Sequence, residues 1–595
     1  MKKLLALLLA LSMVFALAAC GGGSAPAPAS DQPAADAPAA ADAPAAEEAP
    51  ALPEATPVHE TTGTEPQYGG TATVYYPKFY NYFDPSMMDE YQFAFWYETL
   101  WVMDWGLNDA ETFAFDAGSI PIEYLAGQLA EDRGEFDEEA HTLTVKLRDN
   151  VFFQDGEPYN GRALTADDVV WSYSRLLGLG DYEKVVTEYD WARALDMLEA
   201  VEAVDDHTVV FTFKPDMSTT VQLMNFMNAK VNIGGPEWDD CDQSDWHNAK
   251  GTGPYVLTDY VIDNSMTFTR NDNYYGYDER YPENKLPYID TIKLVYIADP
   301  ANILAQSMSG ALDWFGENGK AVLSGDQLAQ LSAADAGQLY GYNTSSPPAI
   351  ALKIPQEPFN DIRVRQAMQL AIDLEAANIY LGNDGPVVVP GLWGPGLSWS
   401  TYGEWPAELE AEFEYNPERA RELMEEAGYP DGFEFEIELD PLTNLELYQL
   451  AADELKQNIN VTMNISVAPE MMEAVQHSQD MEDPRQSAGF AGGFPEYMLA
   501  LMMTGSGEMP NSYGHDDQEY MDELAAVGQA SDETEQTAIA QDLDQYFPAQ
   551  HWAILVAGMQ PNYDFMSNRI GGYTGEKVYY KDNMRTIWSR LWIEE

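Results

Sequence analysis

Hydrophobic and polar residues alternate along much of this chain with the periods of strands and helices. Residues 143 to 147 place apolar side chains at every second position, which predicts a strand with one buried face. Residues 433 to 439 repeat this pattern with glutamate at each even-numbered position, so we expect those glutamates to face solvent. Further strands are predicted at residues 71 to 76 and, after a polar lead-in, within residues 205 to 213. Gly156, which follows an aspartate, predicts a tight hairpin turn.

Three other stretches show the period of amphipathic helices. The first begins at Thr165, three residues before Asp168, which is the spacing of a capping box. The second begins at an Asn-Asp cap and runs over residues 360 to 380. The third is capped by Asn416 and stops at Gly428, because glycine readily adopts the left-handed conformation that ends a helix. The pattern predicts a mixed α/β protein without internal repeats.

The N-terminal segment has the pattern of an export signal. Two lysines precede an apolar run over residues 4 to 19, which is shorter than a membrane-spanning helix requires, and small residues then lead to Cys20. This order predicts a bacterial lipoprotein signal peptide over residues 1 to 20, with Cys20 as the lipidated N-terminus after cleavage. We therefore expect an extracytoplasmic protein, lipid-anchored to the cell membrane at the cell surface or in the periplasm.

The next segment, residues 21 to 66, consists of Ala, Pro, Gly, Ser and acidic residues with almost no large apolar side chains. Such a composition cannot bury a core, so we expect a disordered linker between the anchor and the folded body. No later run approaches the roughly 20 apolar residues of a membrane helix. The body from residue 67 is therefore predicted to be water-soluble.

Composition and charge narrow the range of partners. The 595 residues suffice for two or more lobes, and an apolar fraction of 45% is ordinary for globular proteins. The net charge of −69 repels phosphate backbones, which argues against a nucleic-acid partner. Beyond Cys20 the chain contains only Cys241, so the mature body cannot form an intrachain disulfide, and we expect Cys241 to be a free, inert thiol.

The chain lacks the common signatures of catalysis and metal binding. No G-x-S-x-G, H-E-x-x-H or Walker A pattern occurs, and the seven histidines are scattered. Because the chain has 99 acidic residues, two neighbouring carboxylates are no evidence for the catalytic pair of a glycosidase. The loop from Asp104 to Asp109 lacks a well-placed bidentate acid for Ca²⁺. We expect no enzyme activity, no metal site and no cofactor.

Seven segments in order resemble one family over residues 68 to 595, namely the peptide/oligopeptide-binding (family 5, cluster C) extracellular solute-binding lipoproteins of ABC transporters. The segments are YGGTATVYY, LTVKLRDNVFFQDGEPYNGRALTADDVVWSYSRLL, GTGPYVLTDY, LPYIDTIKLVYIADPANILAQSMSGALDW, PFNDIRVRQAMQLAID, NPERARELMEEAGYPDGF and IGGYTGEKVYYKDNMRTIWSRLWI. Most of these residues belong to caps, turns and core faces, so the resemblance concerns fold and class.

The resemblance implies a two-lobed α/β fold of the periplasmic-binding-protein type (type II, cluster C), with an extra subdomain in the first lobe. Lobe I would comprise residues 67–344 and 558–595, with the subdomain inserted at about 90–205, and lobe II residues 345–557. Strands that cross between the lobes would form a hinge. The ligand would select the closed state, because only that state offers contacts from both lobes.

The resemblance also implies where a ligand binds. In peptide-binding relatives, backbone from both lobes holds the peptide as an added strand. The matching stretches here are residues 88–93 and 489–494. They make the following residues expected ligand contacts: Tyr91, Phe93, Gly489, Phe490, Gly493 and Phe494.

One departure from the family pattern bears on the ligand. Relatives carry an aspartate for the peptide's α-ammonium group at the position of Gly493. A buried ammonium group without a carboxylate is unfavourable by several kcal/mol. Another acid, such as Glu496 or one from the first lobe, would have to replace it, or the ligand has no amine there. Aromatic residues suit stacking on sugar rings, and Trp393 lies in an irregular Gly/Pro-rich loop, residues 391–399, that we expect to line the cleft.

The leading hypothesis is a substrate-binding lipoprotein that captures an oligopeptide and delivers it, as a monomer, to an ABC permease whose ATPases are separate chains. The alternative is the same role for an oligosaccharide or another non-peptide solute. A sensor or adhesin that reuses the fold stays open. An extracellular hydrolase would require catalytic residues that the sequence does not display.

Overall fold

The computed structural model describes most of the chain between residues 65 and 594. The described residues are 65–76, 83–86, 95–105, 115–116, 125–137, 139–180, 182, 195, 197–214, 223, 226–227, 231–316, 323, 325–344, 347–381, 405–441, 443–469, 474, 477–478, 480, 482–490, 520, 522–523, 526, 533–558, 561–573 and 586–594. Among them, no helix is long and apolar enough to span a membrane. The predicted signal peptide and linker lie outside the described residues.

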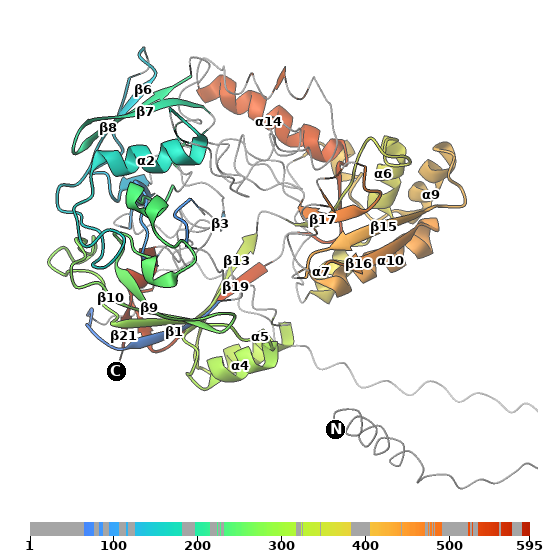
Figure 1. The fold of residues 1–595 in the computed structure, drawn as a ribbon. Coiled ribbons are helices and arrows are strands. Elements are labelled where there is room, and N and C mark those ends of the chain that lie inside the picture. Colours follow the sequence, from blue (N-terminus) through green and yellow to red (C-terminus); the bar gives the residue numbers. More distant parts are fainter. Residues whose placement is uncertain are drawn as a thin grey trace, which may run out of the picture. The chain divides into compact units, whose positions relative to one another are not determined.

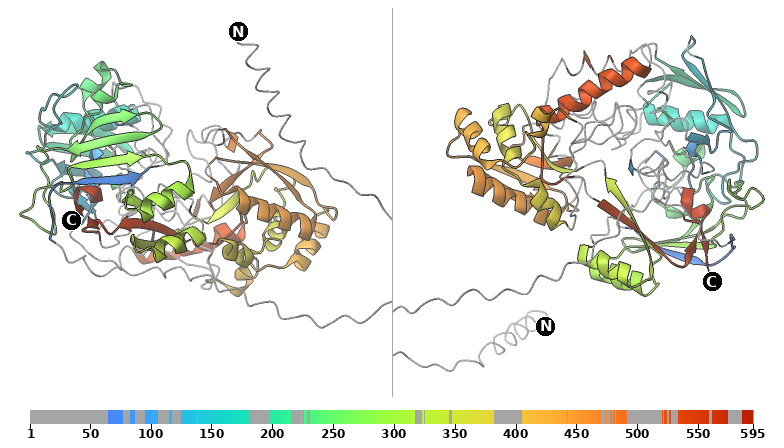
Figure 2. Two further views of the ribbon diagram at one scale, coloured as in Figure 1. Left: turned by 90° about the horizontal axis from the view of Figure 1, so that it is seen from below. Right: turned by 180° about the vertical axis from the view of Figure 1, so that it is seen from behind.

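An eight-stranded sheet contains segments from both ends of the described chain (Figure 1). Its strands, in spatial order, are β3 (Phe115–Asp116), β13 (Gly337–Thr344), β19 (Pro561–Ser567), β12 (Trp314–Phe315), β1 (Thr71–Tyr75), β11 (Thr291–Val295), β10 (Ser265–Arg270) and β9 (Tyr255–Val261). The strand predicted at residues 71 to 76 is confirmed as β1. It pairs in parallel with β11, next to the antiparallel strands β10 and β9 (Figure 2).

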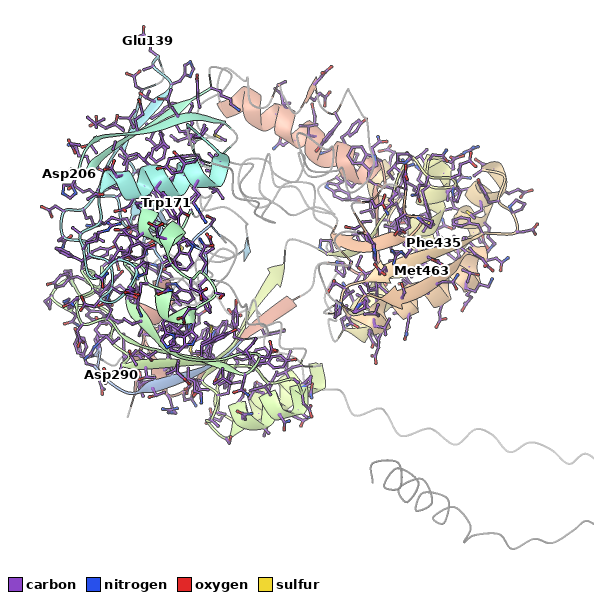
Figure 3. All side chains as sticks on the ribbon, in the orientation of Figure 1. Glu139, Trp171, Asp206, Asp290, Phe435 and Met463 are labelled. Carbon is purple, nitrogen blue, oxygen red and sulfur yellow. The ribbon has the colours of Figure 1, made fainter. Side chains whose placement is uncertain are left out.

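A four-stranded sheet lies within the first half of the chain. It has the order β5 (Glu135–Asp137), β6 (Thr142–Lys146), β8 (Thr208–Phe213) and β7 (Leu198–Asp205), and α2 (Ala166–Leu177) packs against β7 and β8. The predicted strand at β6 and the capping box of Thr165 and Asp168 are confirmed. Trp171 lies on α2, and its side chain, labelled in Figure 3, is almost completely buried.

One prediction in this region is confirmed and one is wrong in detail. The strand predicted within residues 205 to 213 after a polar lead-in is β8, which begins at Thr208 after β7 has ended at Asp205 and the chain has turned at Asp206 and His207. The aspartate side chain of Asp205 accepts the His207 amide and closes this turn. Gly156 does adopt a positive φ of 101°, but the chain returns only at Arg162, whose carbonyl accepts the Phe153 amide. The turn is therefore a longer loop and not a tight hairpin.

A five-stranded sheet is formed by the second half of the chain. Its order is β16 (Thr462–Val467), β15 (Glu434–Leu439), β17 (Gln486–Phe490), β14 (Pro348–Ala351) and β18 (Ala553–Leu555). The helices of this half are α6 (Ile362–Leu370), α7 (Leu374–Tyr380), α8 (Ala407–Glu410), α9 (Pro417–Glu426), α10 (Leu445–Ile459) and α14 (Glu533–Ala549). Phe435 on β15 lies directly opposite Met463 on β16 (Figure 3), and both side chains are buried.

In this half, the sequence patterns predicted where the helices begin more accurately than how long they are. Asp361 and Asn416 cap α6 and α9 through their side chains, as predicted, and Gly428 follows α9 with a φ of 90°. The helix predicted over residues 360 to 380 is instead two helices. Asp373 accepts the Ala376 amide and so caps a second helix, α7, after a break.

The strand β15 corrects one expectation about its glutamates. Glu434 and Glu436 are exposed as predicted, but Glu438 is buried with 7% of its surface exposed. Burial of this carboxylate is possible because Arg485 and His477 both contact it. The alternation of exposed and buried side chains therefore stops at Glu438, one position before the end of the strand.

The remaining elements are short. They are the strand pairs β2 (Trp101–Met103) with β4 (Leu125–Gly127) and β20 (Ile570–Gly571) with β21 (Trp592–Ile593), the helices α4 (Pro300–Met308) and α5 (Gly325–Ala333), and the 3₁₀ turns η4 (Pro236–Asp240), η5 (Trp246–Asn248) and η6 (Ile587–Ser589).

Two short connections join the eight-stranded and five-stranded sheets. The chain leaves the first sheet at the end of β13 and enters the second at β14, and it returns from β18 to β19. We call these two connections the crossovers. β14 and β18 are antiparallel neighbours, as are β13 and β19, so each crossover starts and ends at strands that are paired with those of the other crossover. The predicted lobe boundaries, 344/345 and 557/558, fall on these crossovers and stay a prediction.

Candidate ligand-binding site

The structure describes two of the predicted ligand residues. Gly489 and Phe490 are the last residues of β17. The following predicted site residues lie outside the described residues: Tyr91, Phe93, Trp393, Gly493, Phe494 and Glu496, together with Cys20. The site can therefore be built from the residues that hold the ends of the predicted stretches 88–93 and 489–494.

The end of β17 lies beside the first crossover. Gly489 is paired with Ala349 and Phe490 with Pro348. Because the two strands are antiparallel, the last residue of β17 lies opposite the first residue of β14. In the other sheet, β3 pairs in parallel with Asn343 and Thr344, the last residues of β13. One strand of each sheet thus meets the same crossover from its own side. Chain segments that continue from these strands start next to the proposed hinge.

The start of β17 is held by the buried Lys353, which follows β14. Its ammonium group donates to three backbone carbonyls, at 2.9 Å to His477, 2.7 Å to Asp480 and 3.0 Å to Asp483. The Lys353 amide donates to the side-chain oxygen of Gln486, the first residue of β17, at 2.7 Å. Burial lowers the pKa of Lys353, and the nearby Asp483 and Asp480 oppose this effect.

A cluster of charges joins the same loop to β15. Arg485 forms ion pairs with Asp483, at 2.5 Å, and with the buried Glu438, whose other oxygen lies 2.6 Å from His477 Nδ1. The hydrogen bonds and charge of Arg485 lower the pKa of Asp483 to about 2. The described residues between His477 and Arg485, which we call the 477–485 loop although it begins with helical residues, are thereby attached to β14 and to β15 before the chain enters β17.

In the first half of the chain, Asp84 fixes the turn that precedes stretch 88–93. Its carboxylate receives two bonds from Arg175, at 2.7 and 2.8 Å, and one from the Trp238 indole at 3.1 Å. The Ser86 amide also donates to it at 2.8 Å. Burial alone would raise the pKa of Asp84, but the hydrogen bonds and charge of Arg175 lower it. The carboxylate is therefore ionised and ties the turn to α2.

Glu98 holds the chain after stretch 88–93. Its Oε1 lies 2.8 Å from the Tyr274 hydroxyl, 3.0 Å from the Tyr275 hydroxyl and 3.2 Å from Gln128 Nε2. Its Oε2 is buried and has no hydrogen-bond partner among the described residues. Burial raises the pKa of Glu98 to about 7, although Thr252, Tyr274 and Tyr275 act in the opposite direction.

The described residues contain no group of His, Cys, Asp and Glu arranged to hold a metal ion. Cys241 is a free thiol that donates to the Trp238 carbonyl, and burial raises its pKa to about 11. Its thiolate is therefore disfavoured at neutral pH. The described residues thus fix the chain on either side of stretch 88–93 and before stretch 489–494.

Sequence patterns missed the anchoring residues. Glu98 and Lys353 occur in ordinary apolar surroundings, and the tyrosines that contact Glu98 and the carbonyls that contact Lys353 lie more than a hundred residues away. The burial of Glu438 was not indicated either, since this glutamate continues the alternation that predicted it to face solvent.

The fold is similar to that of a known peptide complex. The structure of the ABC transporter-associated periplasmic binding protein DppA from Helicobacter pylori, in complex with peptide STSA, superposes with a TM-score of 0.69 at 16% identity. The superposition covers 89% of this chain and 99% of that chain. At this identity the likeness concerns the two-lobed α/β fold alone, which the sequence analysis expected.

Sequence comparison then identifies the family. The model of the bacterial extracellular solute-binding proteins, family 5 (middle part), matches residues 125–506, and the chain belongs to this family. Heme-binding protein A of Haemophilus influenzae is 27% identical over 346 residues, 55% of this chain and 58% of that protein. The dipeptide-binding protein of Escherichia coli (strain K12) is 25% identical over 355 residues, 54% of this chain and 61% of that protein. The aligned regions thus span about three fifths of these curated relatives.

Proposed function

We propose that the protein is the substrate-binding component of an ABC importer and captures an oligopeptide between two lobes that close about the crossovers. The observation that carries the proposal is the end of β17, where Gly489 and Phe490 meet the first crossover. An extended ligand beside such a strand end would gain backbone hydrogen bonds. Membership of a solute-binding family supports this role, and enzyme activity is not part of it.

The geometry supports hinge closure for a physical reason. Asp84 before stretch 88–93, Glu98 after it, and Lys353 next to the segment that leads into β17 bind their own half of the chain through buried polar side chains. Each stretch would therefore move with its lobe as a rigid body. A ligand that contacts both stretches in the closed state alone favours that state by the difference in contacts.

A second candidate ligand class is a non-peptide solute, including an oligosaccharide. Gly493 offers no carboxylate for a peptide's α-ammonium group. One relative in the family is named for heme, which is not a peptide. The receptor role is the same in both cases.

The proposal also concerns the cellular location of the protein and its partners. Cys20 would carry the lipid anchor, and the stretch 21–66 would tether a monomeric receptor at the outer face of the membrane. Permease subunits with separate ATPases would receive the ligand. The family's extracellular location supports this address.

The test is thermal unfolding of the purified full-length protein with three ligand sets. They are a mixed tri- to hexapeptide pool, the same pool after N-acetylation, and a set of β-linked oligosaccharides. A ligand present at 100 times its Kd stabilises the folded state by about 2.7 kcal/mol, which gives a measurable shift in the midpoint.

Each outcome has a definite meaning. Stabilisation by free but not acetylated peptides supports the peptide receptor and shows that another acid replaces the missing aspartate. An equal response to both pools supports a peptide receptor that does not recognise the amine. A response to oligosaccharides alone supports the second candidate. No response to any set contradicts capture of either class.

A further inference from the structure

Lys353 is a buried cation whose hydrogen-bonding capacity is filled by backbone. Only 1% of its surface is exposed. Its ammonium group has three N–H donors, and it donates to three carbonyl oxygens, those of His477, Asp480 and Asp483. Among the described residues no carboxylate oxygen contacts this ammonium group. The carbonyl dipoles of one loop therefore solvate the charge in place of water.

The same short segment makes further bonds to the loop and to β17. Gln486 accepts the Lys353 amide and donates to Gln356 Oε1 and to the Pro484 carbonyl, both at 3.0 Å. Gln356 donates to the Asp483 carbonyl at 2.9 Å. Residues 353 to 356 thus bind the last turn of the loop and the first residue of the strand in one network.

The rest of β17 specifies its own position only weakly. It pairs with β15 over two residues and with β14 over four. Ser487, Ala488 and Gly489 have small side chains, which offer little packing to distinguish one register from another. The position of the strand is therefore set mainly where it begins, at the loop that Lys353 binds.

We propose that Lys353 is a positioning residue for ligand binding: its ammonium group sets where the segment that leads into β17 ends, and thereby where Gly489 and Phe490 stand. This inference rests on the proposed function for its ligand part. The charged groups around the ammonium are Asp480, Asp483 and Glu438, which favour its charge, and Arg485, which disfavours it. Positioning by Lys353 requires the protonated form.

The test removes the ammonium group and then supplies it from solution. Lys353→Ala leaves a cavity that n-propylammonium matches atom for atom. Tetramethylammonium has the same charge but no N–H donor. The matched control is Lys456→Ala, which removes an exposed lysine of the same half whose Nζ contacts only the Thr462 hydroxyl.

The first measurement is amide hydrogen exchange in the ligand-free protein. We expect Lys353→Ala to accelerate exchange over residues 477–490 by about tenfold or more, because hydrogen bonds to a charged donor are lost. n-Propylammonium should restore protection, whereas tetramethylammonium at equal ionic strength should not. Lys456→Ala should exchange as the unsubstituted protein does. Unchanged exchange in Lys353→Ala, or rescue by both cations, overturns the inference.

The second measurement is the midpoint shift produced by the tri- to hexapeptide pool. We expect Lys353→Ala to lose the shift, n-propylammonium to restore it and Lys456→Ala to keep it. Accelerated exchange with a full shift would make Lys353 a structural residue only and would overturn its role in binding.

If the unsubstituted protein responds to no pool, the proposed function fails, and the exchange rescue alone decides whether Lys353 positions β17. If Lys353→Ala does not fold, Lys353→Gln, which fills the space without charge, takes its place in both measurements.

Discussion

Burial favours a neutral Glu98 carboxyl group against the effect of its hydrogen-bond donors, and the contact with Tyr275 can accommodate the additional proton. The Tyr275 hydroxyl lies 3.0 Å from Glu98 Oε1 and 3.1 Å from the Gln128 carbonyl, which can only accept. When Tyr275 donates to that carbonyl, its oxygen is available to accept a proton from Glu98. Gln128 cannot reverse its amide, because its Oε1 accepts the Thr99 amide. A proton on Glu98 therefore completes the chain of donors and acceptors.

This arrangement predicts a pH dependence that Glu98→Gln removes. The pKa of Glu98 is raised from 4.5 to about 7, so the folded state loses stability relative to the unfolded state as the pH rises from about 4.5 to about 7. The full difference is roughly 3 kcal/mol. Thermal unfolding is measured from pH 4.5 to pH 8. The midpoint of Glu98→Gln minus that of the unsubstituted protein should increase from pH 4.5 to about pH 7 and stay constant at higher pH. A difference that does not vary with pH would contradict the neutral carboxyl group.

Arg175 permits a second prediction about buried charge. Arg175→Met leaves the ionised Asp84 without its bidentate partner, and such a loss destabilises a protein by about 3 to 5 kcal/mol. The double variant Asp84→Asn with Arg175→Met should be more stable than the single one, because no uncompensated charge remains. Chemical denaturation of the three proteins measures both steps. Equal stability of the single and double variants would show that the ion pair is not the cause.

These anchoring residues also mark the limit of prediction from the sequence. The family pattern predicted a ligand stretch at 489–494, which stays a prediction, and the described part of it, Gly489 and Phe490, lies at the end of β17. The pattern could not reveal Lys353 or Glu98 as anchors, since their burial depends on partners 124 and 176 residues away. Hydrophobic periodicity reports which face of an element is buried, not which distant carbonyl or hydroxyl will meet a charge there.

At the scale of elements, start signals proved more informative than lengths. Side chains of Asp361 and Asn416 accept amides of the first helical turn, as their positions predicted. The break between α6 and α7 was missed because Ala371 and Ile372 continue the apolar pattern, while Asp373 begins a new helix by accepting an amide. A cap in the middle of a periodic stretch competes with helix continuation, and tertiary packing decides the outcome.

The cap of α9 provides a test at this scale. Asn416→Ala removes the side-chain oxygen that accepts the Arg419 amide at 3.1 Å, so we expect a loss of about 1 kcal/mol in stability. Asn416→Asp keeps an accepting oxygen and should lose much less. Urea unfolding of both variants gives the comparison. Equal losses would mean that the hydrogen bond of the cap does not contribute.

At the scale of the whole molecule, basic residues are scarce and are shared between acids. The sequence has 30 Lys and Arg against 99 Asp and Glu. Arg175 forms ion pairs with Asp84 and Asp239, and Arg485 with Asp483 and Glu438. Local pairing of this kind neutralises the buried acids, but most of the net charge of −69 stays unbalanced at the surface.

This excess predicts a strong response to salt. Raising sodium chloride from about 0.01 M to about 0.15 M shortens the screening length from about 30 Å to about 8 Å, which weakens repulsion among surface acids. The midpoint of thermal unfolding should therefore rise over this range. Tetramethylammonium chloride should act equally, because screening depends on ionic strength and not on the cation. A rise with sodium alone would point to specific cation binding instead.

The strand order of the eight-stranded sheet has a consequence for biogenesis. β13 and β12 do not pair with each other, since β19 lies between them and pairs with both. β13 and β3 thus join this sheet only through residues near the end of the chain. A chain that emerges from its N-terminus must keep two strand edges open while the whole five-stranded sheet is synthesised between them. The first sheet can therefore be completed only after residue 567 has been synthesised, so β3 and β13 are among the last strands to join it.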